Sequence, residues 1–144
     1  FITLVRDEAM GIGVIPTKEG LSVLQDIHIG DEEVPIVESG ENQHGHWIKY
    51  YDGTLICWNR WVTRVNINNT LASNAVYSMT PNKAWAFPAT FADIPAVNVD
   101  TVYSNNWATV TGTPSTTTVN WTVLGTVKSD REQTVMIKAI GRWK

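Results

Sequence analysis

Two histidines separated by one glycine, His44 and His46, have the spacing of a short metal-binding motif. Imidazole nitrogens bind transition metals, but a closed structural site needs about four ligands, so two histidines in one chain are too few. Three copies on a threefold axis would together present enough imidazoles for a transition metal. The sequence therefore predicts a metal at His44 and His46 only in a threefold assembly, and no other cofactor; the alternative is two exposed histidines before a strand.

A second group of residues with binding chemistry lies in a predicted turn and comprises Tyr103, Asn105, Asn106 and Trp107. Tyrosine and tryptophan offer a flat apolar face and one polar group, which suits stacking against sugar rings. Turns on a rigid scaffold are a common location for binding residues. We therefore predict these four residues as receptor-binding; the alternative is that Tyr103 and Trp107 only cap the core.

Catalytic residues are harder to find. Adjacent carboxylates occur at Asp7-Glu8 and at 31–33, before the main strand signals. Glycosidases need two carboxyl groups that flank a cleft, one of them with a raised pKa, whereas adjacent acidic residues are typical of a solvated turn. The Gly-x-Ser-x-Gly motif of serine hydrolases is absent, and Cys57 lies in an apolar run that predicts a buried, inert thiol. We therefore expect a protein without enzymatic activity.

Charge and hydropathy argue against two classes of partner. The 144 residues include 17% charged residues, and the net charge is −3. Nucleic-acid-binding domains carry a basic patch, and none stands out here, so no nucleic acid is expected as a partner. The longest apolar stretches are far too short to span a bilayer, so we expect no membrane insertion. Hydrophobic residues make up 43%, enough to build a core.

The N-terminal part differs from the rest. Residues 1–40 contain eight of the fourteen acidic residues, two of the eleven basic residues, and no tryptophan or tyrosine. Their short alternating pieces, broken by glycine and proline, could not bury much surface alone. This predicts a neck or shaft end at residues 1–37 that needs partners, followed by one domain at residues 38–144.

From residue 38 onward the patterns are those of β-strands. Asp52-Gly53 between two apolar segments predicts a hairpin with a two-residue turn, because this dipeptide supplies the positive φ angles that such a turn needs. The alternation after it places Trp58 and Trp61 on opposite faces of one strand. About seven short strands with regular turn signals predict an all-β fold, an antiparallel β-sandwich knob.

Polar segments mark the expected ends of these strands. Residues 66–74 and 128–133 are predicted as turns, and residues 134–140 as the final strand. Five tryptophans inside predicted strands are expected in the core or in a subunit interface: Trp47, Trp58, Trp61, Trp85 and Trp121.

Three segments in fixed order form a recognisable pattern. They are the segment 38–58 with its glycine, aromatic-rich strand and Asp-Gly hairpin; Phe87-Pro88-Ala89-Thr90-Phe91; and the closing Ala139-Ile140-Gly141-Arg142-Trp143. With these segments, residues 38–144 resemble the C-terminal domain of many bacteriophage and prophage tail fibre proteins. The hairpin and the closing strand are fairly specific as a pair.

The resemblance implies a compact β-sandwich, a homotrimer, and binding to a bacterial surface glycan or protein for host recognition and adsorption. It also implies a location at the distal end of a tail fibre on the virion, with residues 1–37 as the end of the shaft. It carries over no receptor-contact residues. Two alternatives remain open, a fragment of a tail-associated polysaccharide depolymerase and a purely structural trimerisation domain.

Overall fold

The computed structural model describes residues 14–17, 20–23, 28–29, 32–33, 36–73 and 75–144. The chain divides into two units, Phe1–Pro35 and Ile36–Lys144. In the first unit, β1 (Val14–Thr17) pairs with β2 (Gly20–Val23), and β3 (His28–Ile29) pairs with β4 (Glu32–Glu33). The acidic residues Asp7, Glu8 and Asp31 lie outside the described residues.

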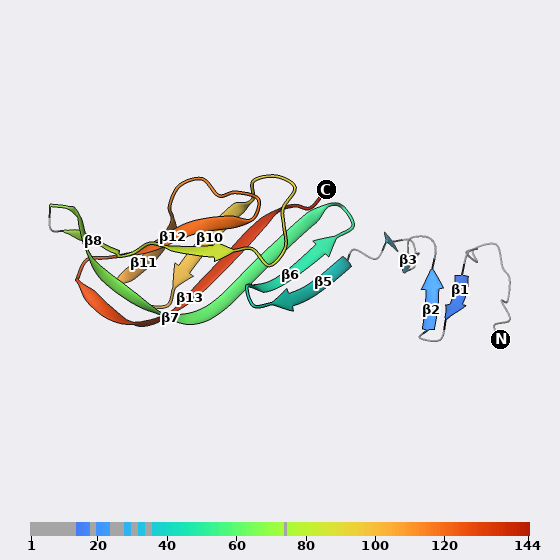
Figure 1. Cartoon of the computed structure of the whole chain (residues 1–144), viewed down its shortest axis with the longest axis horizontal. Helices are drawn as coiled ribbons and strands as arrows, with labels where there is room; N and C mark the ends of the chain where they lie inside the picture. The colour runs from blue at the N-terminus through green and yellow to red at the C-terminus, as the bar shows by residue number, and fades with distance from the viewer. Residues whose placement is uncertain (1–13, 18–19, 24–27, 30–31, 34–35, 74) are drawn as a thin grey trace. The chain divides into compact units, whose positions relative to one another are not determined.

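The second unit consists of nine strands (Figure 1). In chain order they are β5 (Ile36–Asn42), β6 (Gly45–Tyr50), β7 (Thr54–Ala72), β8 (Val76–Met79), β9 (Lys83–Ala86), β10 (Ala96–Thr101), β11 (Asn106–Val110), β12 (Thr118–Gly125) and β13 (Ser129–Arg142). All the pairings among them are antiparallel, and the described residues contain no helix. The predicted all-β antiparallel fold is therefore confirmed.

The nine strands belong to one connected sheet that curls. Its main path runs β10-β13-β7-β8-β12-β11, with β5 and β6 continuing from β7 and β9 pairing with β12. The two strands at the ends of this path, β10 and β11, follow each other in the chain and are joined by residues 102–105. A connection this short requires the ends of the sheet to lie near each other, so the sheet encloses an inner face.

The inner face holds the core because apolar side chains alternate with polar ones along the strands. On β12, the inward residues Val119, Trp121 and Val123 are at most 2% exposed. Trp121 packs edge-on against Trp61 of β7, with ring centroids 5.8 Å apart. The remaining buried apolar residues are Leu55, Cys57, Val65, Ile67, Met79, Trp85, Phe87, Phe91, Val99, Val135, Ile137 and Ala139.

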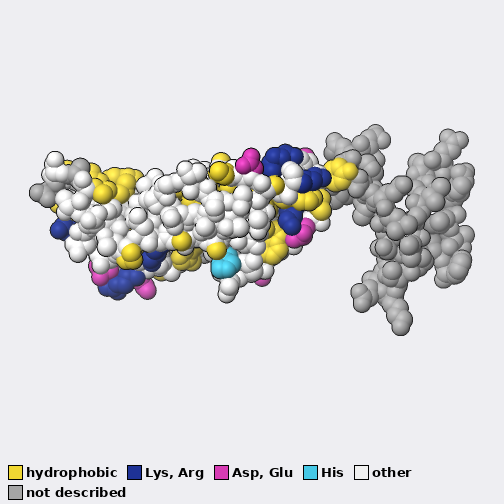
Figure 2. Space-filling view, turned by 45° about the horizontal axis from the view of Figure 1, so that its top comes forward, with side chains coloured by type: hydrophobic (Ala, Val, Ile, Leu, Met, Phe, Trp, Pro, Cys, Tyr) yellow, Lys and Arg dark blue, Asp and Glu magenta, His cyan; other side chains and the backbone are white. Residues whose placement is uncertain are grey.

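One side of the second unit is largely neutral. On the side shown in Figure 2, the Lys, Arg, Asp and Glu side chains of residues 36–144 gather toward the ends, and most of the surface between them is neither charged nor hydrophobic. This distribution reflects the low share of charged residues, 17%. Among the described residues there is no helix that is long and apolar enough to cross a membrane.

The predicted hairpin is confirmed, but its turn contains three residues, 51–53, instead of two. A two-residue type I′ turn needs positive φ at two consecutive positions, and here only Gly53 has one, 94°. Asp52 instead accepts a hydrogen bond through Oδ1 from the backbone nitrogen of Thr54 at 2.8 Å. That bond, which stabilises the carboxylate, lowers the pKa of Asp52.

Two segments predicted as turns are parts of strands. β7 continues through most of residues 66–74 and ends at Ala72, and β13 begins at Ser129, inside the segment 128–133. Ser129 and Asp130 at the start of β13 pair with Ile67 and Asn66, and the last residues of β7 pair with β8. These pairings supply the backbone hydrogen bonds, so the low strand propensity of the polar side chains does not end either strand.

The three segments of the tail-fibre pattern converge at one end of the unit. A Cβ atom on Gly141 would lie 2.9 Å from Phe91 Cδ1, so the glycine lets the aromatic ring pack against the closing strand. The backbone nitrogen of Ala92 donates to the carbonyl of Arg142 at 2.7 Å, and that of Trp143 donates to Gly53 at 2.9 Å. The three sequence segments therefore contact one another in the folded unit.

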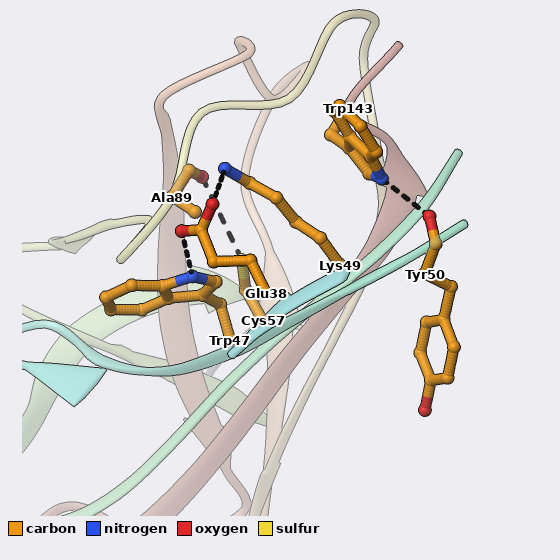
Figure 3. A network of polar contacts seen from close by, with 7 residues as sticks. All are labelled: Glu38, Trp47, Lys49, Tyr50, Cys57, Ala89 and Trp143. Carbon is orange, nitrogen blue, oxygen red and sulfur yellow. Dashed lines mark hydrogen bonds and ion pairs between the residues drawn. The ribbon is translucent and has the colours of Figure 1, made fainter. Parts of the chain in front are cut away.

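Polar contacts surround this region (Figure 3). The Glu38 carboxylate accepts hydrogen bonds from Lys49 Nζ at 3.0 Å and from Trp47 Nε1 at 3.1 Å. The Lys49 bond first, and then the Trp47 bond, lower the pKa of Glu38. Trp143 Nε1 donates to the carbonyl of Tyr50 at 2.8 Å. These bonds connect β5, β6 and the C-terminal residues.

Candidate functional site

The four residues predicted to bind a receptor lie in the turn before β11 and at the start of β11, and their side chains do not all face the same way. Trp107 and Asn106 are neighbours on β11 and point to opposite faces of the sheet. The Trp107 side chain lies on the outer face and is 43% exposed. Asn106 is half-buried, and its Nδ2 atom is buried without a hydrogen-bond partner among the described residues. Asn105 is exposed in the connecting turn.

Tyr103 is engaged by another strand. The guanidinium of Arg131 on β13 lies 4.3 Å from the centroid of the Tyr103 ring, and Arg131 Nη1 donates a hydrogen bond to the Tyr103 hydroxyl. This contact orients the ring and occupies its polar group. Of the four predicted residues, Trp107 therefore has the most available aromatic surface on the outer face.

A groove of about 570 Å³ lies beside Trp107 on the outer face. Trp107 is directly opposite Leu124 on β12, and Leu124 is opposite Ser78 on β8. Both of these residues line the groove, as does Thr109, two positions after Trp107 on the same face of β11. The other lining residues are Asn69, Leu71, Met79, Thr80, Pro81, Asn82, Thr111 and Thr122.

The groove wall combines hydroxyl and amide groups with apolar side chains. Asn69 Nδ2 donates a hydrogen bond to Ser78 Oγ at 3.0 Å, which holds the amide in place and leaves its oxygen as a further acceptor. Thr122 Oγ1 is buried and lies behind the groove surface, whereas Thr80, Asn82 and Thr109 are exposed. Such a wall can exchange hydrogen bonds with a polyol and contact its C–H surface, the arrangement typical of ligand sites.

The polar surface continues from this groove along β7. An adjoining hollow of about 250 Å³ is lined by Asn66, Asn68, Asn69 and Thr80. The pairing of β7 with β8 shifts register between Ile67 and Asn69. A bulge interrupts the strict alternation of side chains, which explains how two consecutive asparagines reach the same hollow.

These asparagines were missed in the sequence because they were assigned to a turn. Three asparagines within four positions, at 66, 68 and 69, are unusual for a strand, in which asparagine is depleted. An asparagine cluster that interrupts a β-branched segment is the signal that could have marked this bulge. The other wall residues come from two parts of the chain, residues 71–82 and residues 109–124.

The two histidines lie at the β5–β6 turn. His46 stacks on Trp58, with ring centroids 5.3 Å apart, and its Nδ1 is 3.3 Å from Glu41 Oε2. The backbone carbonyl of His44 accepts hydrogen bonds from Trp85 Nε1 and Asn59 Nδ2 at 2.8 and 3.0 Å. Within the described part of one chain, no three His, Cys, Asp or Glu side chains lie together in a way that could hold a metal. A metal in a threefold assembly stays a prediction.

Cys57 is a core residue. Its side chain is fully buried, and burial raises the pKa of the thiol to about 11. The neutral thiol is a poor nucleophile, so Cys57 contributes to core packing.

The groove and the adjoining hollow contain no acidic residue, histidine or cysteine among their lining residues.

Comparison with known proteins identifies the fold. No family model matches the sequence, and no curated protein matches it. Among solved structures, the chain is similar to the C-terminal part of the R1 pyocin fibre of P. aeruginosa, with 15% sequence identity and a TM-score of 0.51. The match covers 73% of this chain and 28% of that chain. The resemblance to a fibre C-terminal domain is thus confirmed at the level of the fold.

Proposed function

We propose that this chain is part of a tail fibre, and that residues 36–144 form the tip which binds a bacterial surface glycan during host adsorption. One observation carries the proposal: a domain with the fold of a fibre C-terminal part has a polar groove on its outer face, with the exposed Trp107 beside it. Hydroxyl and amide groups next to an exposed aromatic ring are suited to sugars. A glycan therefore fits this surface better than a protein receptor does.

Binding without turnover is the second part of the proposal. Cleavage of a glycosidic bond normally uses two carboxyl groups on either side of the bond. The groove and the adjoining hollow are lined by amide, hydroxyl and apolar side chains alone. The chain should hold a polysaccharide and leave it intact.

The test is incubation of the full chain with purified bacterial surface polysaccharides. We expect at least one polysaccharide to retain the chain, with no increase in reducing ends over time. Release of reducing ends would instead favour a depolymerase. A heat-unfolded sample of the same chain serves as the control for non-specific retention.

The tip is proposed to act as a homotrimer, since several weak sites on one fibre raise avidity through effective concentration. In support, the outer face of β7 and β13 carries the apolar side chains Trp58, Val62, Met136 and Ile140, which are 36–62% exposed. Light scattering should give about three times the 16.0 kDa of one chain. A mass lowered by a chelator would indicate a metal at His44 and His46, and a monomer would contradict the trimer.

A further inference from the structure

We infer that the groove binds an extended and uncharged stretch of saccharide chain, which lies across more than one hollow along β7. This inference rests on the proposed function and names the class of glycan. It follows from three features of the outer face: the continuity of the hollows, the absence of charged side chains in the walls of the first two, and the position of their asparagine amides.

The hollows form a continuous track. The groove of about 570 Å³ and the hollow of about 250 Å³ share Asn69 and Thr80 in their walls. A third hollow of about 370 Å³ shares Asn66 and Asn68 with the second one. A single small ring would fill only one of these hollows, whereas a chain of linked sugars can lie along all of them. The shape of the surface therefore fits a polymer segment.

The walls of the first two hollows contain no charged side chain. A carboxylate or phosphate bound there would lose hydration without gaining an opposite charge, which is costly. Charged residues first appear in the third hollow, where Lys128 and Asp130 lie. Asp130 is already paired with Arg64, at 2.9 Å, and Lys128 lies over the ring of Tyr77 at 5.4 Å. This track therefore favours uncharged sugars.

The side-chain amides of Asn68 and Asn69 can form hydrogen bonds with sugar hydroxyl groups in a defined geometry. Asn69 is fixed by its bond to Ser78, and the bulge between Ile67 and Asn69 places Asn68 in the next hollow. Each amide offers both donors and an acceptor, which matches the hydroxyl groups of sugars. Leu71 and Leu124 supply apolar contact area in the groove.

The test uses immobilised bacterial polysaccharides, sorted by chemical analysis as uncharged or anionic. The full chain is applied at low salt and at about 1 M salt, where the screening length falls to about 3 Å. We expect retention on uncharged polysaccharides, with affinities that differ less than about twofold between the two salt concentrations. Retention confined to anionic polysaccharides, with affinity that falls steeply in salt, would overturn the inference.

The extent of the track is tested with oligosaccharides of increasing length prepared from a retained polysaccharide. Asn68→Ala should weaken binding of long oligosaccharides by roughly twofold to tenfold, the equivalent of one hydrogen bond, and leave the shortest binding oligosaccharide unaffected. The matched control is Asn98→Ala, an exposed asparagine on β10, which should change neither. Equal affinity of the natural chain for all lengths would overturn an extended site.

The outcomes separate this inference from the proposed function. If the chain is retained only on anionic polysaccharides and Trp107→Ala abolishes this retention, the proposed function stands and the inference of an uncharged ligand is overturned. Retention by no polysaccharide of a broad panel would overturn both. If both Trp107→Ala and Asn68→Ala are still retained on uncharged polysaccharides as the natural chain is, the binding site lies outside this track and the inference is overturned.

Discussion

Trp107→Ala is expected to weaken binding to a bacterial polysaccharide by about tenfold to about a hundredfold, which corresponds to about 1.4–2.8 kcal/mol. The indole is 43% exposed beside the groove and can cover one face of a sugar ring. More than half of the Trp107 surface is covered by its neighbours in the sheet, so the free energy of unfolding should fall by about 1 kcal/mol while the fold is kept. Equilibrium binding of the full chain to a retained polysaccharide measures the effect.

Two variants control this result. Trp107→Phe keeps an aromatic face and should retain most of the affinity. Tyr103→Ala removes an aromatic ring that is 36% exposed and held by Arg131, and it should bind as the natural chain does. If Tyr103→Ala lost binding while Trp107→Ala kept it, the receptor site would lie at the 102–105 turn instead of the groove.

Phe91→Ala should lower the free energy of unfolding by about 3–5 kcal/mol, a typical cost for removing a buried aromatic side chain. Phe91 is 2% exposed, and its ring lies edge-on to Phe87 with centroids 5.1 Å apart. It also fills the space left by the absent side chain of Gly141. The ring therefore joins two of the three motif segments. Urea unfolding followed by tryptophan fluorescence gives the midpoint and the slope.

The slope should stay the same and only the midpoint should fall, because the surface exposed on unfolding is nearly unchanged. Ile94→Ala, three positions later and 55% exposed, is the control and should alter the free energy of unfolding by less than about 0.5 kcal/mol. A loss below about 1 kcal/mol in Phe91→Ala would contradict the packing described for this region.

The strands that were predicted correctly contain local signals. The β6–β7 hairpin follows from Asp52-Gly53 between apolar segments, and the alternation after it correctly places Trp58 and Trp61 on opposite faces. Which of the two residues faces the core was not predicted. The extension of β7 beyond Asn66 was assigned to a turn because of its polar composition. Its partners lie mostly on β8, only a few positions later, and the bulges in that pairing break the alternation by which a strand is recognised.

The candidate site was only partly visible in the sequence. Trp107 was predicted to bind from its aromatic ring in a polar turn, and it lies exposed beside the groove. The groove beside it was not found, because β7, β8, β11 and β12 all contribute to its walls and their order in the sheet is not their order in the chain. Asn106 was predicted to bind and is turned inward, since adjacent residues on a strand point to opposite faces.

Binding of the fluorescently labelled full chain to intact bacteria tests the central claim most directly. A panel of strains is measured untreated, after mild periodate oxidation of surface sugars, and after protease treatment. The account predicts saturable binding to some strains that periodate abolishes and protease leaves intact. Binding that is lost after protease and survives periodate would contradict a glycan receptor.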